Sequence, residues 1–229
     1  MSARAEELAD RLGLSISHHT DKIQAPLGED SLKLVLDENG LALGFVNEKR
    51  GKPMRAEFEY PGRALGKSQI FRRAIGNLAA DTWVCDATVG WGGDFARLLS
   101  CGWRVLGFER SPIMVELIQD GLERARVPKD RYQLVPASVS DWSGEIPSVI
   151  YLDPMFDKPK KSSKSPKGMQ LLQALVGDGE VDNTLLDTSL KIARDRVVIK
   201  RPLKAKTGEP APSFTLPGQS VRYDVWVKS

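Results

Sequence analysis

The sequence predicts an α/β fold: a seven-stranded, mostly parallel sheet between layers of helices, with an antiparallel last strand and a small α+β appendage at the N-terminus. After Pro61-Gly62, short apolar runs alternate with helical patterns, which is typical of β-α-β units around a parallel sheet. Before that point, Asn39-Gly40 lies between two apolar runs, as in a β-hairpin. We therefore expect two domains, the appendage over residues 1–60 and the main domain over residues 61–229.

Three features predict the structure of the appendage. An amphipathic helix is expected over Ala3–Gly13, where the glycine ends it. The hairpin strands are expected over Leu32–Leu36 and Leu41–Val46, because Asn and Gly both tolerate positive φ in the turn between them. The segment Arg55–Tyr60 alternates between polar and apolar residues, which predicts a third strand.

The main domain is predicted as alternating strands and helices. Pro112 suits the first turn of a helix, where a missing N–H costs nothing. The expected helices are Ser68–Leu78, Gly92–Ser100, Pro112–Arg126, Met169–Val176 and Asp182–Ala193. The expected strands are Thr82–Asp86, Trp103–Glu109, Tyr132–Val135, Ser148–Leu152, Arg196–Lys200 and Ser220–Val227.

The composition excludes several classes of protein. The chain has 229 residues, 41% hydrophobic, and no apolar run approaches the roughly 20 residues of a membrane helix. The N-terminus lacks the apolar core of a signal peptide. Two Cys and two His are too few for the usual structural zinc sites, so we expect no metal. Cys85 and Cys101 are interpreted as unpaired thiols in a reducing cytoplasm. The oligomeric state is not indicated.

Positive charge is concentrated in two segments, although the net charge is only +3. Residues 49–73 carry eight Lys and Arg against two Glu, and residues 155–206 carry twelve Lys and Arg against six Asp and Glu. Each segment is therefore +6, which leaves −9 for the rest of the chain. This segregation favours a polyanion bound on one face, whereas the alternative is two solvated basic loops.

A glycine-rich segment lies between the first strand and the first long helix of the main domain. It reads Asp86-Ala-Thr-Val-Gly90-Trp-Gly92-Gly93-Asp94 and suits close approach of a ligand to backbone N–H groups at a helix N-terminus. Phe95 departs from the dinucleotide fingerprint, and Asp86 would repel a phosphate but suit an amino group. The segment therefore favours S-adenosylmethionine over NAD, with a purely structural turn as the alternative.

Glu109 ends the next strand, nineteen residues after Gly90. An acid at this place accepts hydrogen bonds from both ribose hydroxyls of an adenosine cofactor, in either NAD or S-adenosylmethionine enzymes. Arg110 follows and would lie against the adenine. The alternative is a solvated strand end.

The tetrapeptide Asp153-Pro154-Met155-Phe156 follows the strand SVIYL and indicates the reaction. An exocyclic amine that accepts a methyl group needs a partner for its N–H hydrogens, because its lone pair is otherwise delocalised into the ring. The Asp153 carboxylate and the Pro154 carbonyl supply that partner, and Phe156 would stack on a flipped base. The tetrapeptide resembles the (Asp/Asn)-Pro-Pro-(Tyr/Phe) motif of amino methyltransferases. The alternative is a simple Asp-Pro turn.

Five Lys lie within residues 158–167, immediately after this tetrapeptide, and beside a base pocket they would contact phosphates without reading sequence. A solvated lysine loop is the alternative. The residues predicted to contact RNA are Arg63, Lys67, Lys158, Lys160, Lys161, Lys164, Lys167, Lys200 and Arg201.

Taken together, these motifs resemble the RsmJ family of bacterial ribosomal RNA methyltransferases, over roughly residues 30–227. The resemblance implies a Rossmann-like class I methyltransferase fold, S-adenosylmethionine as cofactor, and cytoplasmic methylation of guanine N2 in 16S ribosomal RNA near its 3′ end, on naked RNA or the small subunit. It implies cofactor contacts from Gly93-Asp94, Glu109-Arg110, Ala137-Ser138 and Asp153. One departure is Gly93, where the family typically has Arg.

Three other functions stay open from the sequence. An adenine-N6 methyltransferase acting on DNA or RNA would use the same tetrapeptide. A nicotinamide oxidoreductase would use the same glycines and Glu109. A non-catalytic RNA-binding assembly factor would need only the basic segments.

Overall fold

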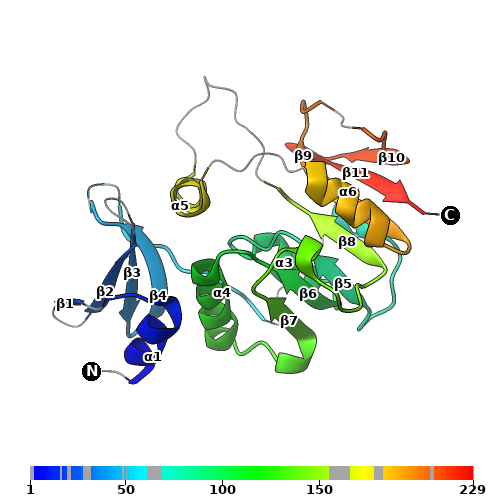
Figure 1. Ribbon diagram of the computed structural model, residues 1–229. Helices are drawn as coiled ribbons and strands as arrows, with labels where there is room; N and C mark the ends of the chain where they lie inside the picture. The colour runs from blue at the N-terminus through cyan, green and yellow to red at the C-terminus, as the bar shows by residue number, and fades with distance from the viewer. Residues whose placement is uncertain are drawn as a thin grey trace.

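A computed structural model describes residues 3–15, 17–19, 22–27, 32–47, 49, 51–60, 69–154, 166–177, 183–206 and 209–228 (Figure 1). The chain forms a four-stranded sheet of order β1-β2-β3-β4 and a seven-stranded sheet of order β10-β11-β9-β8-β5-β6-β7. The predicted domain boundary after residue 60 is followed directly by residues 61–68, which lie outside the described residues. No described helix is both long enough and apolar enough to span a bilayer.

The seven-stranded sheet confirms the predicted class. Strands β5 (Trp83–Asp86), β6 (Arg104–Phe108), β7 (Tyr132–Val135), β8 (Val149–Leu152) and β9 (Arg196–Pro202) run parallel, while β11 (Val221–Val227) is antiparallel to β9. Six of these strands lie where the sequence predicts them. The seventh, β10 (Phe214–Pro217), pairs with β11 at the edge. Because most of its side chains are exposed, β10 lacks the apolar run that reveals the buried strands.

Alternate residues of the central strands enter two separate cores. Val84, Val105 and Tyr151 face a core with α2 (Gln69–Ile75), α3 (Gly93–Ser100) and α4 (Pro112–Arg124). Cys85 and Ile150 face a second core with α6 (Asn183–Ile192). Burial on both faces explains why these strands read as continuous apolar runs. The short helices η2 (Lys129–Arg131) and η3 (Val139–Asp141) flank β7, and α5 (Lys167–Val176) precedes α6.

The N-terminal unit contains α1 (Ala3–Leu12), β1 (Ser17–His19), β2 (Lys22–Leu27), β3 (Leu32–Asp37) and β4 (Gly40–Phe45). The predicted hairpin is β3–β4, and Gly40 has φ of 102° at its turn. Strands β1 and β2 were not predicted, because their residues neither alternate regularly nor form an apolar run.

The predicted strand over Arg55–Tyr60 is wrong. Only Met54 pairs with β4, through two hydrogen bonds of 2.8 Å to the backbone of Leu43. The following residues run without a strand partner over α4, where Ala56 is buried against the core and Phe58 packs beside Gly92. The alternation therefore arises because the apolar side chains face the main core, not because the segment joins a sheet.

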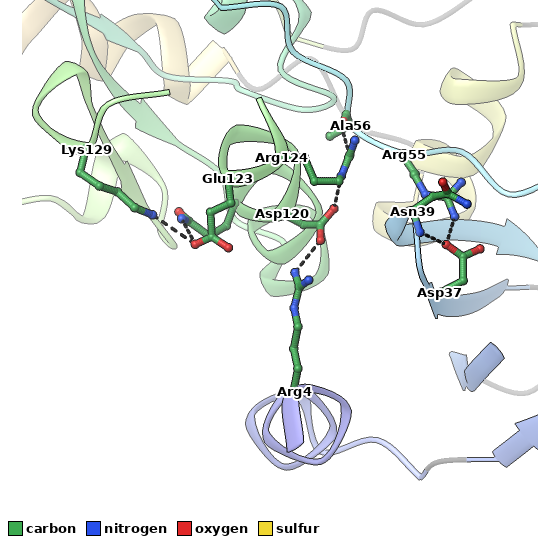
Figure 2. A network of polar contacts seen from close by, with 10 residues as sticks. Arg4, Asp37, Asn39, Arg55, Ala56, Asp120, Glu123, Arg124 and Lys129 are labelled. Carbon is green, nitrogen blue, oxygen red and sulfur yellow. Dashed lines mark hydrogen bonds and ion pairs between the residues drawn. The ribbon is translucent and has the colours of Figure 1, made fainter. Parts of the chain in front are cut away.

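A buried carboxylate fixes the N-terminal unit against α4 (Figure 2). Asp120 of α4 is 2% exposed, and its two oxygens accept hydrogen bonds from Arg4 of α1 at 2.5 Å and from Arg124 at 2.8 Å. Arg124 also donates to the Ala56 carbonyl at 2.6 Å and to Glu57 at 3.0 Å. Since a buried carboxylate is stable only when it is paired, this network supports the contact of α1 with α4, next to the apolar core that α1, β3 and β4 share with the main sheet.

Candidate active site

Four charged residues lie at the carboxyl edge of the seven-stranded sheet. Asp86 ends β5, Glu109 follows β6, Asp153 follows β8, and Lys200 lies near the end of β9. Ligands of open α/β sheets bind at this edge, close to the first strand, where the helices turn to opposite faces. The three acids were predicted as one site, and the sheet brings them to one edge.

The glycine-rich segment turns sharply between β5 and α3. Gly92 has φ of +79°, and a Cβ on it would lie 2.6 Å from the ring of Phe58. A side chain here would therefore strain the backbone at this positive φ and would clash with Phe58 of the N-terminal segment. Gly93, by contrast, has open space beside it, with no atom of another described segment within 4 Å of its ideal Cβ. The loop thus exposes backbone at the start of α3, as the predicted cofactor cradle requires.

Glu109 is oriented by backbone donors of the same edge. Its Oε2 accepts a hydrogen bond from the Gly90 N–H at 2.9 Å, and its Oε1 accepts one from the Ser111 N–H at 2.8 Å. Burial raises the pKa of the Glu109 carboxyl, while these donors oppose the shift. The carboxylate is therefore held beside the glycine loop, where a ribose would meet both features.

Asp86 is a buried acid with one uncommitted oxygen. The residue is 1% exposed, and Oδ1 accepts a hydrogen bond from the Thr88 N–H at 3.1 Å. Oδ2 has no hydrogen-bond partner among the described residues. Burial, with the charges of Asp94, Asp153 and Glu109, raises the pKa of Asp86 to about 8. An amino group at this point would supply the missing donor and a balancing charge.

Asp153 is anchored from two sides. Its backbone N–H donates to Thr88 Oγ1 at 2.6 Å, and its Oδ2 lies 2.6 Å from Lys200 Nζ. Burial raises the pKa of Asp153 to about 6, and Lys200 opposes this shift. The carboxylate is therefore ionised at neutral pH but more basic than an ordinary aspartate.

Asp94 is surrounded by donors and connects the site to the core. Its Oδ2 accepts hydrogen bonds from the Tyr151 hydroxyl at 2.6 Å and from Lys200 at 2.7 Å, and Oδ1 pairs with Arg97 at 3.2 Å. These cations lower the pKa of Asp94. The roles of Thr88 and Tyr151 were not predicted. Both lie inside quoted motifs, but only the fold reveals their partners.

The other predicted residues are distributed more widely. Arg110 is exposed, while Ala137 and Ser138 follow β7, where Ser138 Oγ caps η3 by accepting the Ser140 N–H at 3.2 Å. Lys167 begins α5 and donates to the Lys52 carbonyl. Arg201 is 8% exposed and lies 3.2 Å from Asp224 on β11, so we do not assign it an RNA contact. Pro154 is half-buried beside Asp153. Phe156, Arg63, Lys67, Lys158, Lys160, Lys161 and Lys164 lie outside the described residues.

Trp91 joins the glycine loop to α5 and was not predicted to have a role. Its indole N–H donates to the Gly168 carbonyl at 2.8 Å, and Leu172 of the same helix lies 3.7 Å from the ideal Cβ position of Gly90. Among the described residues, no group of His, Cys, Asp and Glu has the arrangement of a metal site.

Comparison with known proteins places this geometry in a family. Residues 16–228 match the family described as "Putative SAM-dependent methyltransferase". The chain is 36% identical to the ribosomal RNA small subunit methyltransferase J of Pseudomonas aeruginosa strain LESB58, over 98% of this chain and 90% of that protein. The corresponding protein of Pseudomonas fluorescens strain Pf0-1 is also 36% identical, over 99% and 90%. The crystal structure of a SAM-dependent methyltransferase from Neisseria gonorrhoeae superposes with a TM-score of 0.70 at 25% identity, over 99% of this chain and 92% of that one.

Proposed function

The chain belongs to the ribosomal RNA small subunit methyltransferase J family of SAM-dependent methyltransferases, and from this we propose that it methylates the exocyclic N2 of a guanine in 16S ribosomal RNA. The observation that carries the proposal is the place of Asp153: it follows β8 beside the glycine loop, its backbone is fixed by Thr88, and its carboxylate is ionised at neutral pH.

The described residues fit S-adenosylmethionine. Glu109 lies beside the loop, where it would accept hydrogen bonds from the ribose, and Asp86 Oδ2 is a buried acceptor without a donor among the described residues, which the amino group of the methionine moiety would supply. The open space at Gly93 admits the ligand beside the backbone. Ala137-Ser138 and Arg110 would flank the adenine. When bound, this cofactor supplies an electrophilic methyl group on a sulfonium.

The chain's own residues orient the acceptor and receive its proton. Asp153 and the Pro154 carbonyl accept the N–H hydrogens of the amine, which turns its lone pair toward the methyl group. As the new C–N bond forms and the S–C bond breaks, the nitrogen becomes acidic, and its proton passes to Asp153 or to water. No covalent enzyme intermediate is needed, so neither Cys85 nor Cys101 takes part.

We propose that the substrate is the small ribosomal subunit or naked 16S RNA. The protein would therefore act in the cytoplasm. The basic segments 49–73 and 155–206 support binding to phosphates. Because such contacts carry no sequence information, recognition of the target guanine would depend on the base pocket and on RNA shape.

The test is transfer from labelled S-adenosylmethionine to purified small subunits and to naked 16S RNA, followed by digestion to nucleosides. We expect N2-methylguanosine from the parent and its loss in Asp153→Ala, with retention in the exposed control Asp130→Ala. N6-methyladenosine would retain the enzyme class but overturn the target. RNA binding without transfer to either substrate would favour the assembly-factor alternative.

A further inference from the structure

We infer that Lys200 is a positioning residue for methyl transfer, whose ammonium holds the Asp153 carboxylate toward the substrate amine and separates it from Asp94. The inference rests on the proposed function. It revises the expectation that Lys200 contacts RNA phosphate, and it assigns a role to a residue of β9 that lies outside the glycine loop and the tetrapeptide.

The placement of Lys200 follows from sheet register. Strands β8 and β9 are parallel, and Leu152 pairs with Ile199. The residues that follow this pair, Asp153 and Lys200, therefore lie side by side just beyond the β8–β9 pairing. Lys200 Nζ lies 2.6 Å from Asp153 Oδ2 and 2.7 Å from Asp94 Oδ2. One ammonium thus bridges two carboxylates that come from different elements.

Burial makes this bridge stronger than a surface ion pair. The side chains of Lys200 and Asp94 are 23% and 12% exposed, and that of Asp153 is 36% exposed. Partly buried charges are screened less by solvent than exposed ones. The two carboxylates also repel each other, so that only a cation between them keeps both ionised. Lys200 is therefore committed to these acids and is poorly placed to neutralise a phosphate.

The bridge selects one oxygen of Asp153 for chemistry. Oδ2 is taken by Lys200, so we assign Oδ1 to the substrate amine. Without the ammonium, Asp153 would face Asp94 directly and would become protonated at higher pH. A protonated carboxyl presents an O–H and loses part of its capacity to accept the N–H hydrogens that orient the lone pair.

Several other ionisable groups surround this pair and contribute to its titration. Tyr151 donates to Asp94, and Arg97 contacts both Asp94 and the Tyr223 hydroxyl. Among the described residues, the groups facing the bridge are Asp86 on β5, Asp94 and Arg97 on α3, Tyr151 on β8, Lys200 on β9 and Tyr223 on β11. Of these, Lys200 is the cation that contacts Asp153.

The test measures kcat and KM for the methylated substrate, small subunit or 16S RNA, from about pH 6 to 9 in Lys200→Met, Lys200→Arg and the control Lys228→Met, which is exposed and lies outside both basic segments. In Lys200→Met we expect kcat near pH 7 to fall about tenfold or more and the acidic limb of the profile to move up by about one pH unit. The KM for RNA should stay within about twofold, because no phosphate contact is lost. Lys200→Arg should recover most of kcat, and Lys228→Met should match the parent.

A double variant separates electrostatics from general damage. Adding Asp94→Asn to Lys200→Met removes the repelling carboxylate, so the acidic limb should return toward the parent position. Thermal unfolding and S-adenosylmethionine binding, measured without RNA, report whether each variant folds. If Lys200→Met alone does not fold, Lys200→Arg and the double variant still carry the comparison.

Each contrary outcome has a distinct meaning. A raised KM for RNA with a weaker salt dependence and unchanged kcat would show a phosphate contact and overturn the inference. If Lys200→Met loses kcat equally at every pH, and neither Lys200→Arg nor the added Asp94→Asn restores it, Lys200 has only a structural role. That result would also overturn the inference. An inactive parent would overturn the proposed function instead, since the variants are interpreted only against an active parent.

Discussion

The indole N–H of Trp91 donates to the carbonyl of Gly168 at 2.8 Å, which ties the glycine loop to the first turn of α5. This hydrogen bond joins two segments that are far apart in the sequence. The residues between β8 and α5 include the end of the tetrapeptide, so the bond links the predicted cofactor loop to the helix that follows the predicted substrate pocket.

Trp91→Phe removes the N–H donor but keeps an aromatic ring, so it should weaken the contact between the glycine loop and α5. A lost hydrogen bond of this kind costs about 1 kcal/mol, which lowers the unfolding temperature by roughly 2–4 °C in a chain of this length. The affinity for S-adenosylmethionine, measured by calorimetry, should fall by several-fold. Trp226 of β11 donates a similar hydrogen bond, of 3.0 Å, to the Pro210 carbonyl. Trp226→Phe should lower the unfolding temperature comparably with unchanged affinity, and equal affinity losses would argue against the link.

Two adjacent glycines should respond differently to alanine. Gly92→Ala places a methyl group 2.6 Å from Phe58 at a positive φ, so we expect a loss of stability of about 1–3 kcal/mol. Gly93→Ala meets no atom of the described residues within 4 Å and should leave unfolding by denaturant unchanged. Because the family typically has the larger Arg at this position, the methyl group should also leave the affinity for S-adenosylmethionine unchanged. A loss of stability in Gly93→Ala equal to that in Gly92→Ala would contradict this description of the loop.

The sequence was sufficient for the features that depend on local pattern. Asp86, Glu109 and Asp153 were identified because each acid follows an apolar run, and parallel strands bring such positions to one edge of the sheet. The Asn39-Gly40 hairpin was identified from its turn chemistry. The central strands could be predicted because burial on both faces makes them continuous apolar runs.

Features that depend on distant partners could not be predicted in this way. Lys200 contacts Asp153 and Asp94, which are 47 and 106 residues away in the sequence, so its position near other basic residues suggested RNA instead. Segment 55–60 alternates like a strand, but packing over α4 takes the place of strand pairing. Strand β10 forms only because β11 offers it an edge.

The contact between the N-terminal unit and α4 should depend on Asp120. Asp120→Ala removes the buried acceptor that Arg4 and Arg124 share, although Arg124 keeps its bonds to Ala56 and Glu57, and we expect a loss of about 2 kcal/mol or more in the free energy of unfolding by denaturant. Arg4→Ala removes a half-exposed partner and should cost less than about 1 kcal/mol. Equal losses in the two variants would contradict the view that Asp120 acts through Arg124 as well as through Arg4.

Asp86 should make the stability of the ligand-free protein depend on pH. Its pKa is raised to about 8 in the fold, whereas an aspartate in the unfolded chain has its ordinary value of 3.8. The folded state therefore binds the proton more tightly. Its stability should fall as pH rises between these two values, by up to about 1.4 kcal/mol per pH unit, and then level off above pH 8.

Asp86→Asn preserves the shape of the side chain and cannot ionise, so it isolates this effect. We expect the difference in unfolding free energy between Asn and Asp to be constant below about pH 4, to grow in favour of Asn as pH rises, and to flatten above about pH 8. Urea unfolding at a series of pH values measures it, with the exposed Asp130→Asn as the control whose difference stays flat. Parallel curves for Asp86→Asn and the parent would show that Asp86 is ionised in the fold. In the same variant, S-adenosylmethionine should bind more weakly at pH 8, because the carboxylate that we propose as the partner of its amino group is gone.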